Sequence, residues 1–398
     1  MTASRTHLTA VEVTPGPDGV HRVYHQLRES EESGNPFAPV PAVSRYFPVA
    51  VVDSIRRALA LELPVHPDTQ VVLTTSGSTG SPRGVEFARD QLTALNRFIN
   101  SGEVVGQSFT EPPQWVAALP ATSAGGFNVL SRALHAGRPP LVLESVAGAG
   151  SFTADEVART LSQHDQGPLM ISLVPAQLRR LLGTEDGTDT LRRFELVLVG
   201  GSAAPISDRI RARDEGITAV FTYGMTETTG GCVFNGVPAP GVSVEMDGTL
   251  RIRGPVVATG YRPTTDSPAQ LFGGRFTTAD MGEITSEGSV LITGRVDDIV
   301  IINGVNISLF AIKNIIDAHP QVHDSWVLPD LTALVVVEQS ATVPEDQLRT
   351  QISENLGTLA LPRFIAVRAL PYLPNGKVDR QGIMQLPELA HLPRTPYG

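Results

Sequence analysis

The feature that most limits the fold is a repeated alternation of short apolar runs with amphipathic segments between residues 51 and 224. The apolar runs are QVVLTT, WVAALP, PPLVLES, LMISLVP, ELVLVGGS and TAVFTYG. Segments with helical spacing lie between them, such as VVDSIRRALALEL, DQLTALNRFIN and ADEVARTLSQH. Strands that alternate with helices favour a parallel sheet covered on both faces. The pattern therefore predicts an α/β fold.

Two other stretches have a different composition and a different spacing of apolar residues. Residues 1–45 are polar and rich in turn residues, which predicts a surface arm or a short irregular segment. After residue 229, a DG turn is followed by alternating Leu250 and Ile252, and EITSEGSVLITGR repeats this pattern around an EG turn. Alternation around tight turns is typical of antiparallel strands. We expect a small β-barrel-like subdomain there.

The last part of the chain, residues 309–398, predicts a helix, two strands, a helix and a strand. A chain of 398 residues is too long for one ordinary core. We therefore expect a large N-terminal domain of layered, mostly parallel sheets with helices over residues 1–296, and a small α+β domain over residues 297–398.

Charge and cysteine content limit the partners and the compartment. Arg and Lys total 31 against 41 Asp and Glu, so the net charge is −10. This balance disfavours nucleic-acid binding, which requires cations that displace counterions. The single cysteine, Cys232, excludes an intrachain disulfide and fits a reducing compartment. With no apolar run of about 20 residues and no apolar N-terminal core, we expect a cytoplasmic protein without membrane insertion.

The stretch TTSGSTGSPRG, residues 74–84, follows a predicted strand. Its small residues and hydroxyls can cradle phosphates, and a strand followed by a helix is the usual context for such a loop. It is not a Walker A loop, because Pro82 stands where the second glycine would follow Gly77, and it does not match the dinucleotide pattern. From these residues alone, a solvent-exposed flexible turn stays an alternative.

Further polar motifs follow along the chain. YGMTETTGG offers the aromatic ring of Tyr223 and the carboxylate of Glu227 within five positions. A carboxylate near bound phosphates usually shares a Mg²⁺ ion with them. Asp280 lies in RFTTADMGEI, Arg295 in TGRVDDIV, and Lys377 in the glycine-containing turn LPNGKVDR.

These five motifs, with VLVGGSAAP at residues 197–205 between the first and the second, make six in order between residues 71 and 380, and they resemble the core motifs of the acyl-adenylate-forming superfamily. That superfamily contains acyl-CoA synthetases, adenylation domains of peptide synthetases, and luciferases. The resemblance implies an ATP- and Mg²⁺-dependent enzyme with a mobile C-terminal domain that turns about Asp297. It also implies that the N-terminal subdomain is abbreviated, since fewer residues precede the phosphate loop than in longer relatives.

The resemblance also implies roles for single residues. Arg83 stands where the family usually has lysine, Tyr223 matches the aromatic residue on adenine, Glu227 the Mg²⁺ ligand, and Asp280 with Arg295 the pair at the ribose. The implied nucleotide-binding set is Thr75, Ser76, Gly77, Ser78, Thr79, Gly80, Gly201, Ser202, Tyr223, Gly224, Met225, Thr226, Asp280 and Arg295. The implied catalytic set is Lys377, Thr226, Glu227 and Arg83.

Lys377 matches the lysine that bridges the substrate carboxylate and the α-phosphate. Two anions approach each other in this step, so a cation between them stabilises the developing charge. The implied reaction forms an acyl-AMP and pyrophosphate. The C-terminal domain then turns, removes Lys377, and brings the INGVNIS loop near Gly304 to a channel for a thiol such as coenzyme A.

Three stretches resemble the short o-succinylbenzoate–CoA ligases of menaquinone biosynthesis: VAALPATSAGGFNVLSRALHAG, SLVPAQLRRLL and TYGMTETTGGCVFNGVPAPGV. The implied partners are an aromatic carboxylic acid, ATP and coenzyme A, and relatives are often homodimers. Thr122 and Ser123 stand where relatives often carry histidine or an aromatic residue. Candidates for the acyl pocket, by motif position only, are Gly125, Gly126, Phe127, Ser172, Val174, Gly200, Ser202 and Thr228.

Other functions remain open at this stage. The chain can instead be another aryl- or acyl-CoA ligase, or a freestanding adenylating enzyme that loads a carrier protein. A third hypothesis is a nucleotide-binding regulatory protein without turnover. The presence of Glu227, Asp280, Arg295 and Lys377 together argues against this last hypothesis, because each serves a separate step.

Overall fold

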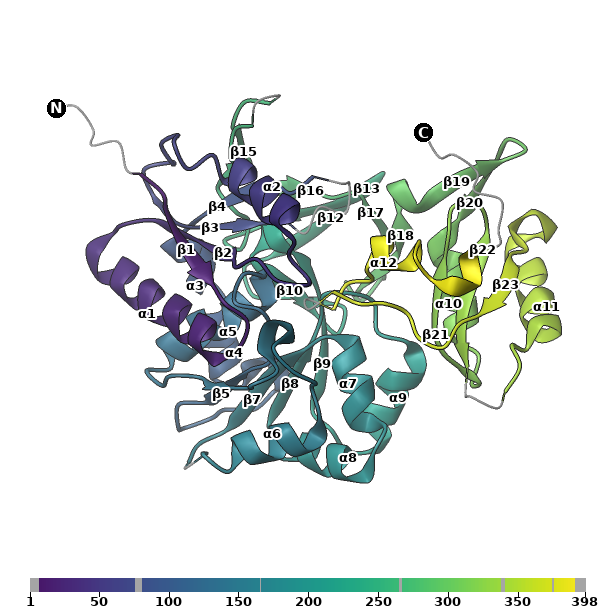
Figure 1. Cartoon of the computed structure of the whole chain (residues 1–398), viewed down its shortest axis with the longest axis horizontal. Coiled ribbons are helices and arrows are strands. Elements are labelled where there is room, and N and C mark those ends of the chain that lie inside the picture. The colour runs from purple at the N-terminus through teal and green to yellow at the C-terminus, as the bar shows by residue number, and fades with distance from the viewer. Residues whose placement is uncertain are drawn as a thin grey trace.

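The computed structural model describes residues 7–75, 81–164, 166–264, 267–337, 341–373 and 376–390 (Figure 1). A seven-stranded sheet lies at its centre, with strand order β11-β10-β9-β8-β7-β5-β6. Neighbouring strands from β6 to β9 run parallel, and β10 and β11 are added antiparallel. The strands are β5 (Gln114–Ala117), β6 (Leu141–Val142), β7 (Leu169–Leu173), β8 (Leu196–Val199), β9 (Ala219–Met225), β10 (Gly230–Phe234) and β11 (Val237–Pro238).

Helices alternate with these strands, as the sequence pattern predicts. Apolar clusters lie on both faces of the sheet, because successive residues of its buried strands point to opposite sides. The helices are α5 (Ala124–His135), α6 (Ala154–Leu161), α7 (Pro175–Leu182), α8 (Glu185–Arg192) and α9 (Ile206–Asp214). The α/β expectation is confirmed.

A second sheet of six strands has the order β1-β2-β3-β4-β14-β15. Strands β1 to β3 run parallel, and the following pairs run antiparallel. The helix α2 (Val49–Leu59) lies between β2 and β3 in the chain. The strands are β1 (Thr9–Val13), β2 (Phe37–Pro41), β3 (Thr69–Thr74), β4 (Gly84–Ala88), β14 (Gly260–Tyr261) and β15 (Gln270–Leu271).

The expectation of an irregular N-terminal arm is wrong. The first described residues form β1, the long helix α1 (Pro17–Ser33) and β2, drawn in purple in Figure 1. All five residues of β2 are buried, and α1 buries Val23 and Leu27 against the same core. Burial of these apolar side chains outweighs the weak local preference for regular structure.

Residues 89–100 form two short helices, α3 (Arg89–Thr93) and α4 (Asn96–Asn100), rather than the one helix that the spacing predicts. Asn96 and Asn100 are buried, and their side-chain amides donate to the carbonyl oxygens of Ser131 and Arg132 on α5. The two asparagine side chains thus point toward α5 and bind its backbone. In one continuous amphipathic helix these polar side chains would be expected to face solvent.

The chain after residue 229 is antiparallel, as expected. One sheet contains β12 (Ser243–Asp247), β13 (Thr249–Arg253) and β16 (Arg275–Thr277), and a second contains β17 (Asp280–Ile284) and β18 (Val290–Arg295). In the part of the chain that is described, these strands do not close into a barrel.

The C-terminal part has its own apolar core and lies to the right in Figure 1. It begins with a hairpin of β19 (Ile299–Ile302) and β20 (Val305–Ser308). The predicted order then follows as α10 (Leu309–Asp317), β21 (Val322–Val327), β22 (Thr332–Val337), α11 (Glu345–Leu356) and β23 (Arg363–Ala366), with a short α12 (Arg380–Ile383) at the end. The separate core supports the expected boundary near residue 297, which stays a prediction.

Short 3₁₀ turns complete the structure at η1 (Glu103–Val105), η2 (Val146–Gly148), η3 (Thr226–Thr228), η4 (Val296–Asp298), η5 (Thr358–Ala360) and η6 (Pro387–Leu389). Among the described residues, no helix has the length and apolar character that crossing a bilayer requires.

Candidate active site

The connection from β3 to β4 contains the predicted phosphate loop, of which Ser76, Gly77, Ser78, Thr79 and Gly80 lie outside the described residues. At its base, the Thr75 amide donates to the Arg83 carbonyl oxygen at 2.9 Å, and the Arg83 amide donates to the Thr75 hydroxyl at 3.0 Å. Strands β3 and β4 are antiparallel, and α3 begins only after β4. The expected strand-then-helix context is therefore wrong, and no helix N-terminus follows this loop.

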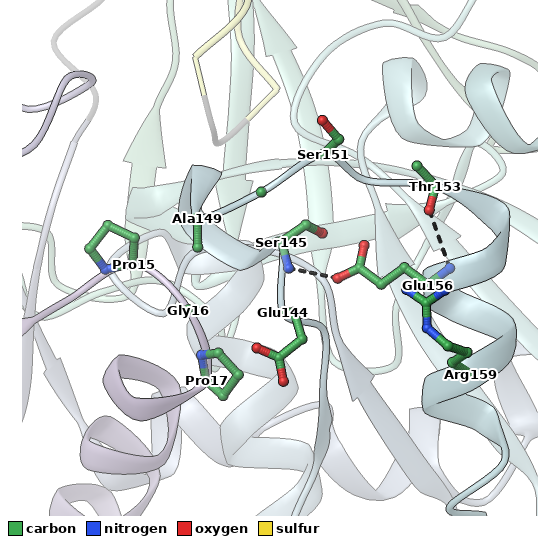
Figure 2. A pocket seen from close by; sticks show the side chains of 11 residues that line it. Pro15, Gly16, Pro17, Glu144, Ser145, Ala149, Ser151, Thr153, Glu156 and Arg159 are labelled. Carbon is green, nitrogen blue, oxygen red and sulfur yellow. Dashed lines mark hydrogen bonds between the residues drawn. The ribbon is translucent and has the colours of Figure 1, made fainter.

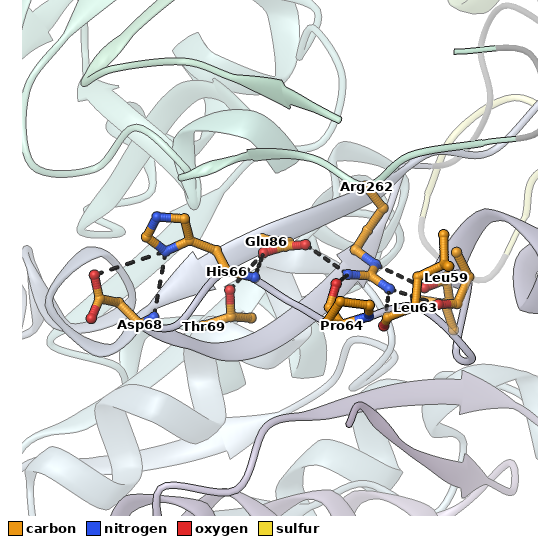
Figure 3. A network of polar contacts seen from close by, with 9 residues as sticks. Leu59, Leu63, Pro64, His66, Asp68, Thr69, Glu86 and Arg262 are labelled. Carbon is orange, nitrogen blue, oxygen red and sulfur yellow. Dashed lines mark hydrogen bonds and ion pairs between the residues drawn. The ribbon is translucent and has the colours of Figure 1, made fainter. Parts of the chain in front are cut away.

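A buried arginine cluster fixes the strand that leaves the loop (Figure 3). The Arg262 guanidinium pairs with Glu86 of β4 at 2.9 Å and also donates to four backbone carbonyls at the end of α2 and just after it, those of Leu59, Ala60, Leu63 and Pro64. A Cβ on Gly84 would stand 2.6 Å from the Ala58 carbonyl oxygen and 2.7 Å from Arg262 Cγ. Glycine is therefore required where β4 starts.

Glu227 lies in η3, directly after β9, and its carbonyl oxygen accepts from the Ala258 amide at 2.9 Å. Its carboxylate accepts a hydrogen bond from the Tyr261 hydroxyl at 2.5 Å. The Arg83 guanidinium stands over the Tyr261 ring, 4.8 Å from its centroid. Tyr261 therefore links the cation beside the phosphate loop to the predicted Mg²⁺ ligand.

Sequence reasoning missed Tyr261, because no local pattern connects it with a glutamate 34 positions earlier. Burial raises the pKa of the Tyr261 hydroxyl, and the Glu227 carboxylate raises it further. The phenol therefore stays protonated and continues to donate to Glu227.

A chain of hydrogen bonds joins Tyr223 to the expected hinge. The Tyr223 hydroxyl donates to Asp280 Oδ2 at 2.7 Å, and Arg295 Nη1 donates to Asp280 Oδ1 at 2.7 Å. Asp280 and Arg295 are cross-strand partners in β17 and β18, which explains their contact. Arg295 also binds both carboxylate oxygens of Asp297, at 2.8 and 2.9 Å. The structure thus brings together the predicted adenine, ribose and hinge residues.

These contacts have electrostatic consequences. Hydrogen bonding to Arg295 lowers the pKa of Asp297, and the pKa of Arg295 is raised by its hydrogen bonds to Asp297 and by nearby carboxylates. Burial and the Asp280 charge raise the pKa of Tyr223. All three groups therefore keep their usual charge at neutral pH, and Arg295 and Tyr223 stay hydrogen-bond donors.

Lys377 lies in a tight turn after β23, and this yellow segment reaches from the C-terminal part toward the centre of the molecule (Figure 1). Its side chain is accessible to solvent, but surrounding protein atoms displace part of its water and lower its pKa. The nearby charges of Glu227 and Asp280 oppose this shift. The lysine is therefore among the residues predicted to bind nucleotide and metal.

Three acyl-pocket candidates meet at the carboxyl edge of the parallel strands. Ser172 lies near the end of β7, Val174 directly before α7, and the Gly200 amide donates to the Leu173 carbonyl oxygen at 3.1 Å. The carboxyl edge of such strands is the usual place for ligands in α/β sheets. A Cβ on Gly376 would stand 2.3 Å from Val174, so the turn of Lys377 packs against this edge.

Other predicted residues surround this edge. Gly201 has a positive φ of 90°, Ser202 is exposed beside it, and the close approach of β10 to Gly224 leaves no space for a side chain there. The Met225 amide donates to the Thr228 hydroxyl at 3.0 Å, and Thr226 begins η3.

Two acyl-pocket candidates lie deeper than the rest. Phe127 has no exposed surface and packs against Phe37, and Thr228 is fully buried with its hydroxyl bound to the backbone of Met225 and Gly230. These contacts are those of core residues. Gly125 and Gly126 start α5, where the Gly126 amide donates to the hydroxyl of Ser123 at 3.2 Å.

The carboxylate set suits a metal that is held partly by a nucleotide. Among the described residues, no three His, Cys, Asp or Glu side chains gather as a metal-binding group. Mg²⁺ commonly uses one or two carboxylates and takes its other ligands from phosphates and water. Glu227, which is held by Tyr261 and lies near the phosphate loop, fits this limited role.

A cavity of about 420 Å³ lies elsewhere, between the start of α1, η2 and α6 (Figure 2). Its wall includes Glu156, whose Oε1 accepts from the Ser145 amide at 2.6 Å, while the Glu156 amide donates to the Thr153 hydroxyl. None of the predicted site residues lines it. The carboxylate here caps local backbone.

Comparisons with known proteins agree with these motifs. Residues 10–262 match the family model described as AMP-binding enzyme. A Mycobacterium tuberculosis protein named "Probable 2-succinylbenzoate--CoA ligase" is 33% identical over 347 residues, covering 84% of this chain and 88% of that protein.

Two solved structures of o-succinylbenzoate coenzyme A synthetase (MenE) from Bacillus subtilis have the same fold. One, with the acyl-adenylate intermediate OSB-AMP, has a TM-score of 0.66 at 21% identity and covers 96% of this chain and 89% of that one. The other, with ATP and magnesium ion, has a TM-score of 0.65 at 22% identity and covers 94% of this chain and 88% of that one. The match of the family model over most of the large domain and the M. tuberculosis relative establish that this chain belongs to the AMP-binding enzyme family.

Proposed function

We propose that the chain is a 2-succinylbenzoate–CoA ligase that acts in menaquinone biosynthesis through an acyl-adenylate. The position of the Lys377 turn carries the proposal: it packs on Val174 at the carboxyl edge of the central sheet, where Glu227 and Asp280 act on the lysine charge. The substrate follows the name of the M. tuberculosis relative, which this chain matches over 84% of its length.

In the first half-reaction, a carboxylate oxygen of the acid attacks the α-phosphorus of ATP, and pyrophosphate leaves. Lys377 places a positive charge between the two anions as the new P–O bond forms. Loss of such a cation costs a factor of roughly 10²–10³ in rate, or ~3–4 kcal/mol. Tyr223, Asp280 and Arg295 orient the nucleoside, and Thr226 and Arg83 act at its phosphates.

A magnesium ion would supply charge neutralisation at the phosphates when bound. Glu227 would hold it, and the Tyr261 hydroxyl fixes the orientation of that carboxylate. Arg83 stands on the other side of the Tyr261 ring and adds a second positive charge near the phosphate loop.

In the second half-reaction, the thiol of coenzyme A loses its proton to solvent, its sulfur attacks the acyl carbon, and AMP leaves with the electron pair of the broken acyl–oxygen bond. The C-terminal domain turns about Asp297, which lies in η4 between β18 and β19. This motion withdraws Lys377 and brings the β19–β20 hairpin around Gly304 to the acyl-adenylate. Coenzyme A is thus a co-substrate.

The test is ATP–pyrophosphate exchange with 2-succinylbenzoate, followed by detection of the thioester with coenzyme A. We expect both. Exchange with benzoates or fatty acids but not with 2-succinylbenzoate would assign another acyl-CoA ligase. If exchange occurs but no thioester forms with coenzyme A, and a thioester does form with a carrier protein, the chain is a loading enzyme. A homodimer and a cytoplasmic location stay predictions, to be checked by sedimentation and by fractionation of cells.

A further inference from the structure

Arg179 on α7 bridges two carboxylates that belong to different parts of the chain. Its Nε donates to Asp208 Oδ2 of α9 at 2.8 Å, and its Nη1 lies 3.6 Å from Asp324 Oδ2 of β21. The side chains of Asp208 and Asp324 are only 11% and 13% exposed. One guanidinium therefore connects the large domain with the sheet of the C-terminal domain.

The Asp324 carboxylate also binds the segment that leads to the Lys377 turn. The Tyr372 hydroxyl donates to Asp324 Oδ2 at 2.6 Å. Tyr372 pairs with Val378 in an antiparallel bridge, and the Leu373 amide donates to the Lys377 carbonyl oxygen at 2.8 Å. An ion pair followed by hydrogen bonds thus connects Arg179 with the backbone of Lys377 and Val378.

Helix α7 holds this turn at two points. Val174 precedes the helix and packs on Gly376, while Arg179 lies five residues later and reaches Asp324. The contact of Val174 with Gly376 holds the Lys377 turn against the central sheet. The contact of Arg179 with Asp324 holds the C-terminal domain, which carries this turn, against the large domain. Both contacts join residues on opposite sides of the expected hinge, so rotation of the C-terminal domain would break both.

Arg179 is also required by charge. Burial raises the pKa of both Asp208 and Asp324, and the Asp324 charge raises the pKa of Asp208 further, whereas the Arg179 charge lowers both values. Without the arginine, two largely buried like charges would face each other across the domain boundary. Their repulsion would favour separation of the two domains at this place.

We propose that Arg179 is a positioning residue for the adenylation half-reaction, which holds Asp324 and Tyr372 so that Lys377 stays at the carboxyl edge of the central sheet. It does not touch the reacting atoms. The proposal rests on the function proposed above, because it assigns Lys377 to adenylation. Since the bridge opens when the C-terminal domain turns, Arg179 acts in one half-reaction only.

The experiment measures the two half-reactions of Arg179→Met separately. We expect ATP–pyrophosphate exchange to fall by about 10- to 100-fold in kcat with little change in KM for ATP, because the loss is one of positioning. Formation of the thioester from supplied acyl-adenylate and coenzyme A should stay within about twofold of the wild-type rate. Equal loss in both half-reactions, or no loss in exchange, would overturn the proposal.

Arg180→Met is the matched control, since it removes the same charge from the neighbouring position of α7. Arg180 is exposed, and its Nη1 donates to the Phe152 carbonyl oxygen within the large domain. We expect both half-reactions to stay at wild-type rates. Arg179→Lys should recover part of the exchange activity, because a lysine can pair with one of the two carboxylates.

Two further variants keep the test decisive if Arg179→Met folds poorly. Tyr372→Phe removes only the hydrogen bond to Asp324, and we expect a selective loss of exchange of about 3- to 10-fold. Asp324→Asn combined with Arg179→Met should cost little more than Arg179→Met alone, because the residues act together; additive losses would contradict the proposal. If wild-type enzyme shows no exchange with any acid, the proposed function fails, whereas normal wild-type exchange with unaffected variants removes only the role of Arg179.

Discussion

Arg262 and Arg179 both pair with carboxylates, but their surroundings differ. The side chain of Arg262 has no exposed surface, and each of its nitrogens donates to a carbonyl or carboxylate oxygen within the large domain (Figure 3). Arg179 is 25% exposed and reaches one carboxylate at 2.8 Å and another, across the domain boundary, at 3.6 Å.

The difference shows what each cluster can do. A buried guanidinium with satisfied donors cannot leave its partners without leaving charge and carbonyls unpaired, so it acts as a permanent joint. A partly exposed pair with one long contact can open at small cost, since water replaces the lost partner. The first cluster supports the base of the phosphate loop, and the second is suited to the domain rotation proposed above.

The largest effect is expected for Arg262→Met. It leaves the buried Glu86 carboxylate without its cation and removes the donors to the carbonyls at the end of α2 and just after it. We expect a loss of about 3–5 kcal/mol in the free energy of unfolding, measured by urea denaturation. Arg213→Met, which removes an exposed pair with Asp214, should change it by less than about 0.5 kcal/mol. A loss below about 1 kcal/mol for Arg262→Met would mean that the cluster is not a permanent joint.

Gly376→Ala tests the contact between the Lys377 turn and the large domain, which the proposed rotation would break. Gly376 has a φ of 76°, and an added Cβ would meet Val174 at 2.3 Å. We expect exchange to fall by about 10- to 100-fold, since the Lys377 turn can no longer pack on this edge, while the thioester half-reaction is retained. The measurement is the same pair of assays.

Gly357→Ala is its control. Gly357 has a similar positive φ of 85° but nothing within 4 Å of the added Cβ. It therefore carries the backbone strain without the contact, and we expect both half-reactions to keep their rates. If Gly357→Ala lowers exchange as much as Gly376→Ala, strain in the C-terminal domain rather than packing on Val174 is responsible.

A smaller effect is expected in the pH dependence of adenylation. Surrounding protein atoms exclude water from Lys377 and so disfavour its charged form, which lowers its pKa. The ammonium therefore loses its proton at a pH below the ordinary 10.5. Since the charged form is required, kcat/KM for exchange should fall as the pH rises through this lowered value, by about tenfold per pH unit beyond it. Lys377→Arg should move this alkaline limb upward.

Arg179 should behave differently in the same experiment. Its carboxylate partners raise its pKa, so it keeps its charge over the whole range. Arg179→Met should therefore lower the plateau of kcat/KM without moving the alkaline limb. If the alkaline limb disappears in Arg179→Met, a group of the Arg179 cluster, and not Lys377, titrates there.

The N-terminal part of the fold shows where sequence reasoning fails. Strand β2 is FAPVP, and its two prolines argue against a strand that lies between two others. It pairs with β3 only through Phe37 and Val71, so Pro39 and Pro41 give up few ladder bonds on that side. Burial in the sheet, which depends on residues far away in sequence, decides the outcome.

In the candidate site, too, some residues can be predicted from the sequence and others cannot. Tyr223, Asp280 and Arg295 stand in recognisable motifs, and the structure brings them into contact. The contacts of Tyr261 and Arg179 join segments that are 29 or more residues apart, without any local pattern. Such contacts are set by how the sheets and the C-terminal domain pack, so single-sequence reasoning cannot locate them.

The smallest effect is expected at the edge of the Arg262 cluster. His66 donates its amide to Glu86, and its Nδ1 lies 3.8 Å from the Asp68 carboxylate, whose side chain is 77% exposed. Asp68→Asn should change the free energy of unfolding by less than about 0.5 kcal/mol, because solvent screens the charge of this exposed carboxylate. Thr69→Val, which removes a buried hydrogen bond to the same Glu86, should cost about 1–2 kcal/mol. If both variants cost the same in urea denaturation, the rigidity of the cluster extends to its exposed edge, and burial is not what separates a permanent joint from a movable one.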